Sequence, residues 1–264
     1  MIAPPSDSQP FWSLFAPILV ALPRVGTAVA VVPLFPSNLF PMLLRSAVGV
    51  SLALFLYPHM AANMPAPATS LLWMALIGKE ACIGALLGFA VGTLVWVFES
   101  AGAVIDYQVG FSNAQIFDPF GGHDAGLMGQ LMARLGIILF VVGGGLYVLA
   151  SLLFESFHLW PVASFYPATR GLVDLAGGSI RSLTDLTVRV AAPVVLLLAL
   201  VDIGFGLINR VVPQLNVFLF TMPVKGALAA LMIALYVSYL SDLVAAQLSG
   251  LPDVLRRLAL LLGR

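Results

Sequence analysis

Charged residues are scarce in this sequence of 264 residues. Asp, Glu, Lys and Arg together make up 9% of it, whereas soluble domains carry about 25%. Hydrophobic residues make up 61%, which excludes an ordinary water-soluble globule. The twelve basic and twelve acidic residues cancel, so net charge gives no reason to expect nucleic acid or an anionic substrate as a partner. The composition therefore predicts a membrane protein.

Cysteine and the motifs of catalysis are also nearly absent. Cys82 is the single cysteine, so this chain alone forms no disulfide and no cysteine-based zinc cluster. Cys82 lies in an apolar stretch and is expected to be a small buried hydrophobe. The three histidines, His59, His123 and His158, lack metal-ligand spacing and are expected in interfacial loops. Because no nucleophile elbow, His-Glu-x-x-His motif or phosphate-binding loop is present, the sequence predicts no enzyme, no metal and no cofactor.

What the sequence does contain is long uncharged runs, and about 20 such residues cross a bilayer as a helix. Residues 135–154 are the cleanest candidate, and Gly143 to Gly145 within them are expected to allow close helix packing. The runs are too long for strands and lack two-residue alternation. Prolines punctuate several of them. The predicted fold is an all-α membrane-type protein made of kinked, proline-broken helical hairpins.

The distribution of polar residues predicts three regions. Residues 1–160 are expected to form N-terminal helical hairpins, residues 161–189 a polar connector, and residues 190–264 a C-terminal helical hairpin with an amphipathic tail. Within the connector, Asp185 and Arg189 are four residues apart and can meet on one helix face.

Charged residues inside the apolar runs are the first candidates for function. In a lipid-facing helix each would cost about 2.5–3.5 kcal/mol, so we expect inter-helix or inter-subunit polar contacts. The residues singled out are Arg24, Lys79, Glu80, Glu99, Asp106, Asp202, Arg210 and Lys225. Glu99 and Asp106 share a helix face and either pair with neighbouring arginines or belong to a proton path. Lys79 and Glu80 are adjacent and are not expected to pair with each other.

The segment of residues 102–119 is the second candidate, because it places acids, amides, glycines and a proline in a chain that is otherwise hydrophobic enough for a membrane. Such polarity is tolerated at hydrocarbon depth only where it is buried in protein or lines an aqueous path. The segment is therefore expected to belong to a conduit or its closure. A proton-coupled secondary transporter with Glu99, Asp106 and Asp202 as ion sites is the alternative, although the paired repeats typical of transporters are not seen.

Four stretches, in order along the chain, resemble the FliR/SctT family of export-gate subunits of bacterial type III secretion and flagellar systems. The run from Glu99 to Pro119 is similar to the family's Glu-x-x-Gly-x-x-Ile/Val-Asp-x-Gln-x-Gly segment, which ends in Phe-Asp/Asn-Pro. Residues 156–161 resemble its Ser-x-x-Leu-Trp-Pro element, residues 213–225 its Pro-Gln-x-Asn…Pro-x-Lys hairpin, and residues 24–28 its arginine-containing first helix. The Leu-Trp-Pro element and the Asp-Tyr-Gln-Val-Gly run favour an injectisome member over a flagellar one.

This resemblance implies a non-enzymatic core subunit of an export gate in the bacterial inner membrane, within the basal body of the secretion system. The implied partners are two small hydrophobic export proteins, FliP/SctR-like and FliQ/SctS-like, with which the subunit forms a channel for unfolded substrates. The large export-gate protein, the switch protein and membrane lipid are further implied partners, and no nucleic acid is implied.

The resemblance also implies that a plug-like loop, residues 106–122, closes the pore. The plug residues would be Gly110, Phe111, Ser112, Asn113, Gln115, Ile116, Phe117, Asp118, Pro119 and Phe120. The aromatic and isoleucine side chains among them would block passage by packing and dewetting. An ordinary buried loop is the alternative.

Overall fold

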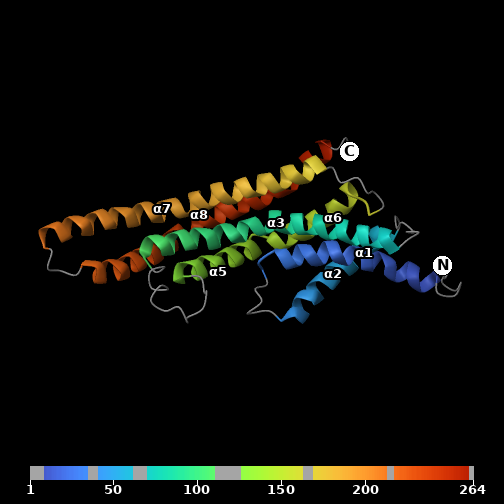
Figure 1. Cartoon of the computed structure of the whole chain (residues 1–264), viewed down its shortest axis with the longest axis horizontal. Coiled ribbons are helices and arrows are strands. Elements are labelled where there is room, and N and C mark those ends of the chain that lie inside the picture. Colours follow the sequence, from blue (N-terminus) through green and yellow to red (C-terminus); the bar gives the residue numbers. More distant parts are fainter. Residues whose placement is uncertain are drawn as a thin grey trace. The chain divides into compact units, whose positions relative to one another are not determined.

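The part of the chain described by a computed structural model comprises residues 9–34, 41–61, 70–110, 126–162, 169–212 and 217–261. Its elements are α1 (Gln9–Val31), α2 (Met42–Ala61), α3 (Ser70–Val109), α5 (Leu127–Val142), α6 (Gly145–Leu159), α7 (Thr169–Val211) and α8 (Val217–Leu261) (Figure 1). No strand occurs in these ranges. The predicted all-α class is confirmed.

Within the described ranges, three helices are long and apolar enough to cross a membrane: Leu71–Val109, Val173–Val211 and Phe220–Pro252. Helices α5 and α6 would supply a fourth span if they are counted together. The candidate span over residues 135–154 is broken in the structure, because α5 ends at Val142 and α6 begins at Gly145 with a bend of 66° between them. Gly144 between them has a φ of +82°, a left-handed conformation that glycine adopts without a steric penalty. The glycines here separate two helices.

The prolines break fewer helices than predicted. Pro23 lies within α1, Pro193 within α7 and Pro223 within α8, and each helix continues past its proline. Pro33 and Pro161, in contrast, lie just beyond helix ends. A proline removes one backbone donor and crowds the carbonyl four residues earlier. A long apolar helix that satisfies its other backbone groups internally nevertheless continues past the proline.

The polar stretch expected to be a connector is helical from residue 169 onward and forms the first half of α7. The ion pair expected there is confirmed, since Arg189 Nε lies 2.8 Å from Asp185 Oδ2. Both side chains are more than half exposed.

The contacts of the chain group it into two compact units. Unit 1 comprises Met1–Gly92, Gly144–Ser179 and Leu248–Arg264, and unit 2 comprises Thr93–Gly143 and Ile180–Gln247. Each of α3, α7 and α8 therefore contributes one part to each unit.

In unit 1 the core forms where α1 and α3 approach closely. A side chain at Gly84 would overlap the backbone carbonyl of Arg24, and one at Gly88 would overlap the backbone of Ala28. Two glycines four residues apart on a helix let a second backbone approach in this way. Thr27 Oγ1 adds an inter-helix hydrogen bond of 3.0 Å to the carbonyl of Ala81.

In unit 2, glycines likewise allow α3 and α5 to approach closely. A side chain at Gly102 would meet the backbone of Gly129, and Gly136 lies against the ring of Phe98.

The surface of the described helices is rich in apolar side chains, many of which are large and exposed. Cys82 is also exposed, so its predicted burial was wrong. A membrane helix is apolar on all sides, and hydrophobicity therefore does not identify its buried face.

Candidate functional site

Arg24 on α1 is the centre of a buried polar cluster in unit 1. Its side chain is fully buried, and its Nε donates a hydrogen bond of 2.6 Å to Oε2 of the equally buried Glu80. Nη1 donates to Ser156 Oγ at 3.1 Å, and Nη2 donates to the carbonyl of Trp160 at 2.9 Å. The guanidinium also lies 4.0 Å from the centroid of the Phe157 ring, a favourable cation–π distance.

Lys79 completes this Arg24 cluster from the edge. Its Nζ lies 2.9 Å from Glu80 Oε1 and donates to the carbonyls of Pro161 (3.3 Å) and Val162 (2.9 Å). The expectation that adjacent Lys79 and Glu80 do not pair was wrong. Both side chains are long, so their charged ends meet although they leave the helix in different directions. The contact is ionic and lacks hydrogen-bond geometry, so Oε1 has no hydrogen-bond donor among the described residues.

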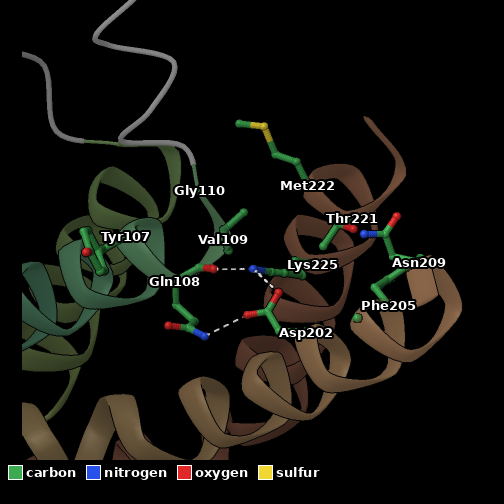
Figure 2. A pocket seen from close by; sticks show the side chains of 11 residues that line it. Tyr107, Gln108, Val109, Gly110, Asp202, Phe205, Asn209, Thr221, Met222 and Lys225 are labelled. Carbon is green, nitrogen blue, oxygen red and sulfur yellow. Dashed lines mark hydrogen bonds and ion pairs between the residues drawn. The ribbon is translucent and has the colours of Figure 1, made fainter. Parts of the chain in front are cut away.

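The second cluster lies in unit 2 and joins three helices through Gln108 of α3, Asp202 of α7 and Lys225 of α8. Lys225 Nζ lies 2.6 Å from Asp202 Oδ1 and donates a 2.6 Å hydrogen bond to the backbone carbonyl of Gln108. The Gln108 side chain closes the ring, since its Nε2 donates to Asp202 Oδ2 at 3.0 Å. Figure 2 shows the Lys225 ammonium between the Gln108 carbonyl and the Asp202 carboxylate. We call these three residues the Lys225 network.

A cavity of about 360 Å³ adjoins the Lys225 network. Tyr107, Gly110, Asn209 and Met222 are among the residues that line it (Figure 2). Gly110 has a φ of +99° and directly follows the end of α3. The cavity and the network therefore lie where the chain leaves α3 toward the predicted plug loop.

Asp106 holds the two helices that flank this loop. Its buried carboxylate accepts hydrogen bonds from the backbone N–H groups of Met128 (3.0 Å) and Gly129 (2.6 Å) in the first turn of α5. The N-cap residue Gly126 has no side chain for this task, so Asp106 caps α5 from another helix. A carboxylate at a helix N-terminus satisfies donors without an intrahelical partner and interacts favourably with the helix dipole.

The structure thus brings five of the predicted polar residues into two clusters and gives Asp106 main-chain donors where arginine partners were expected. Glu99 and Arg210 are exposed and form no ion pair within the described ranges. Of the predicted plug residues only Gly110 is described. Outside the described residues lie Phe111, Ser112, Asn113, Gln115, Ile116, Phe117, Asp118, Pro119 and Phe120.

The sequence prediction missed the neutral members of both clusters, namely Gln108, Ser156, Phe157 and Trp160. A signal was present, because all four lie in the motifs that carry the family resemblance. No group of three or more potential metal ligands was found among the residues whose placement is described.

Comparison with known proteins identifies the family. The sequence profile of "Bacterial export proteins, family 1" matches residues 15–251, a range that includes both clusters. The "Yop proteins translocation protein T" of Yersinia pestis is 35% identical over 217 residues, which cover 81% of this chain and 83% of that protein. The "Surface presentation of antigens protein SpaR" of Salmonella typhimurium is 29% identical over 226 residues, with 85% and 84% coverage. The "Flagellar biosynthetic protein FliR" of Bacillus subtilis is 27% identical over 252 residues, with 95% and 97% coverage.

These relatives are named as translocation and flagellar biosynthetic proteins, and a further one, SsaT of Salmonella typhimurium, is named as a secretion system apparatus protein. None of these names denotes an enzyme. With the helices long and apolar enough to span a membrane, the matches lead to one conclusion: the chain belongs to the FliR/SctT family of bacterial export proteins and is a membrane-embedded, non-enzymatic subunit of a type III export apparatus.

Proposed function

We propose that this chain is a core subunit of the type III export gate. In this proposal it forms a channel in the bacterial inner membrane, within the basal body, together with FliP/SctR-like and FliQ/SctS-like partners. Unfolded substrates pass through the channel, and the large export-gate protein and the switch protein dock on the assembly. The observation that carries the proposal is the exposure of two charges, Glu99 and Arg210, on α3 and α7, both of which are long and apolar enough to span a membrane.

Exposed charges on such helices are not compatible with a chain surrounded by lipid. At the centre of a membrane-spanning helix a charge costs about 2.5–3.5 kcal/mol. This cost applies to Glu99 in the interior of α3 more than to Arg210 in the last turn of α7, and a partner subunit or a water-filled passage removes it. Large apolar side chains are also exposed, for example Met42 (86%) and Leu196 (70%). Large exposed apolar surfaces mark protein–protein or membrane contacts. The apolar surface fits either contact, so it is the exposed charges that support an assembly around an aqueous path.

The plug assignment is supported by the way the loop is anchored. Asp106 joins the last turns of α3 to the first turn of α5, and the Lys225 network joins the end of α3 to α7 and α8. The described residues on both sides of the segment 111–125 are thus held by charged contacts. We propose that this loop closes the channel in its resting state.

An injectisome is the proposed setting. The translocation protein from Yersinia pestis is 35% identical to this chain, and the flagellar relatives from Bacillus subtilis and Escherichia coli are each 27% identical. The match to the Yersinia pestis protein agrees with the two motifs that favour an injectisome member, although SsaT of Salmonella typhimurium is also 27% identical.

The alternative, a proton-coupled transporter, receives less support from the geometry. Asp202 is paired with Lys225, and Asp106 is occupied by two main-chain donors. Two of the three candidate ion sites are therefore engaged by other groups of this chain, and Glu99 is the third.

Co-purification tests the assembly. We expect the chain to yield a discrete complex of fixed stoichiometry when it is produced with the two small partners, and to aggregate when it is produced alone. Native mass spectrometry of the detergent-solubilised complex measures this. A monodisperse single chain that transports ions in liposomes would instead establish the transporter alternative.

Deletion of Phe111 to Phe117 tests the plug. We expect the assembled gate to leak ions and small dyes in membrane vesicles once this segment is removed. A deletion of equal length in residues 62–68, between α2 and α3, is the matched control and is expected to leave the vesicles tight. Unchanged permeability in a fully assembled plug deletion would contradict the assignment.

A further inference from the structure

The end of α3 depends on a side chain from another helix. The last carbonyls of any helix lack intrahelical donors, and in α3 the N–H of Gly110 serves the carbonyl of Asp106. The carbonyl of Gln108 instead accepts from Lys225 Nζ at 2.6 Å. A cation at the C-terminus of a helix also interacts favourably with the negative end of its dipole. Lys225 therefore stabilises the last turn of α3 from α8.

Asp202 holds this arrangement together because one carboxylate serves two partners. Oδ1 pairs with Lys225, and Oδ2 accepts from the side-chain amide of Gln108. We propose that Asp202, Lys225 and Gln108 form a releasable lock that positions the C-terminal end of α3 against α7 and α8, with Lys225 as the central positioning residue. The functional consequence, that release of the lock opens the channel, rests on the function proposed above.

Water access makes the lock releasable. The side chain of Asp202 is 41% exposed, whereas that of Lys225 is 9% exposed. The adjoining cavity of about 360 Å³ has room for water or for a displaced side chain (Figure 2). An exposed carboxylate that loses its partner is rehydrated, so the ion pair is worth little by itself. The bond from Lys225 to the Gln108 carbonyl carries the positioning.

This geometry predicts how strongly three substitutions release the C-terminal end of α3. Lys225→Met removes both the ion pair and the cap on the carbonyl, so it has the largest effect. Asp202→Asn weakens the ion pair but leaves the lysine on the carbonyl. Gln108→Leu removes only the side-chain amide, because the backbone carbonyl remains, and has the smallest effect.

A spin label on α3 reads the state of the lock. Tyr107 is 77% exposed and has no part in the three contacts, so Tyr107→Cys in a Cys82→Ala background carries the label in the full chain purified with its partners. We expect the immobile component of the label spectrum to be lost in Lys225→Met, reduced in Asp202→Asn and retained in Gln108→Leu. Asp185→Asn, which removes an exposed ion pair on the same α7, is the matched control and is expected to leave the spectrum unchanged.

A charge exchange distinguishes the lock from an ordinary ion pair. Asp202→Lys combined with Lys225→Asp restores opposite charges but leaves no donor at position 225 for the Gln108 carbonyl. We expect the label to remain mobile in this double variant, whereas Lys225→Arg keeps a donor and restores the immobile spectrum. An immobile label in the exchanged variant, or in Lys225→Met, would overturn the inference. Should Lys225→Met fail to accumulate, Asp202→Asn decides, because a spectrum equal to that of Asp185→Asn overturns the inference equally.

Vesicle leak measured on the same variants separates this inference from the proposed function. A mobile label together with a leak that follows the same order supports both. A mobile label without any leak supports the lock and contradicts the proposed closing role of the loop. A leak with an immobile label overturns the lock, because the passage then opens without movement of the end of α3.

Discussion

The Arg24 cluster of unit 1 and the Lys225 network of unit 2 use the same groups, namely a cation, a carboxylate and a backbone carbonyl. They differ in their access to water. Arg24 and Glu80 are both completely buried, whereas Asp202 is 41% exposed beside a cavity. A buried charge that loses its partner carries a large desolvation cost, and an exposed one does not. Burial therefore makes the first cluster permanent, and water access makes the second one reversible.

Breaking the buried cluster is expected to have the largest effect. Arg24→Met leaves Glu80 with Lys79 as its remaining partner and removes the donors to Ser156 and the Trp160 carbonyl. Removing one partner of a buried pair costs about 3–5 kcal/mol, and Lys79 keeps the expected cost near the lower end. We expect severe loss of the protein from membranes, measured by quantitative immunoblotting. Arg189→Met, which removes the exposed pair with Asp185, serves as control. Equal accumulation of the two variants would contradict the comparison.

Admitting water to the buried cluster is expected to have an intermediate effect. Gly84→Ala places a methyl group against the carbonyl of Arg24 and must push α1 away from α3. Overpacking of this kind costs about 1–3 kcal/mol. We expect a lower thermal midpoint for the purified complex. Gly78→Ala on the same helix, where nothing lies within 4 Å of the added Cβ, is expected to match the wild type. A midpoint shift common to both variants would point to glycine's backbone preferences and not to packing.

The smallest effect is expected from loss of the exposed ion pair between Asp185 and Arg189. Asp185→Asn removes an ion pair whose side chains are 58% and 63% exposed, and such pairs contribute about 0.3–0.5 kcal/mol. We expect no measurable change in secretion and a midpoint shift that disappears in high salt, because salt screens exposed charges. A secretion defect in an assembled Asp185→Asn complex would show that exposure alone does not separate the dispensable pairs from the functional ones.

The sequence predicted the fold class well for a physical reason. A run of about 20 apolar residues has only one way to satisfy its backbone in a membrane, so helices followed from length alone. The positions of the helix ends were harder to predict. Pro193 and Pro223 lie inside continuous helices, whereas Gly144 separates α5 from α6. Proline and glycine act through local geometry, and tertiary context decides the outcome.

Partners of the polar residues were harder to predict than the residues themselves. Asp106 attracted attention as a buried acid, yet its partners are two backbone N–H groups that appear in no sequence pattern. Glu99, on the same predicted face, is exposed, because neighbouring elements cover that face only in part. Gln108 contributes its backbone carbonyl to the Lys225 network, and a carbonyl is common to every residue. Spacing predicts which side chains share a face, but only the packed helices define what lies opposite.

The cap that Asp106 provides for α5 has a consequence for how this protein can vary. A single carboxylate fastens the departure and the return of the intervening segment, so insertions or deletions between those points need not disturb the helices on either side. Changes within that segment are therefore expected to alter closure of the channel without lowering the amount of folded protein, so that the two effects can be measured separately.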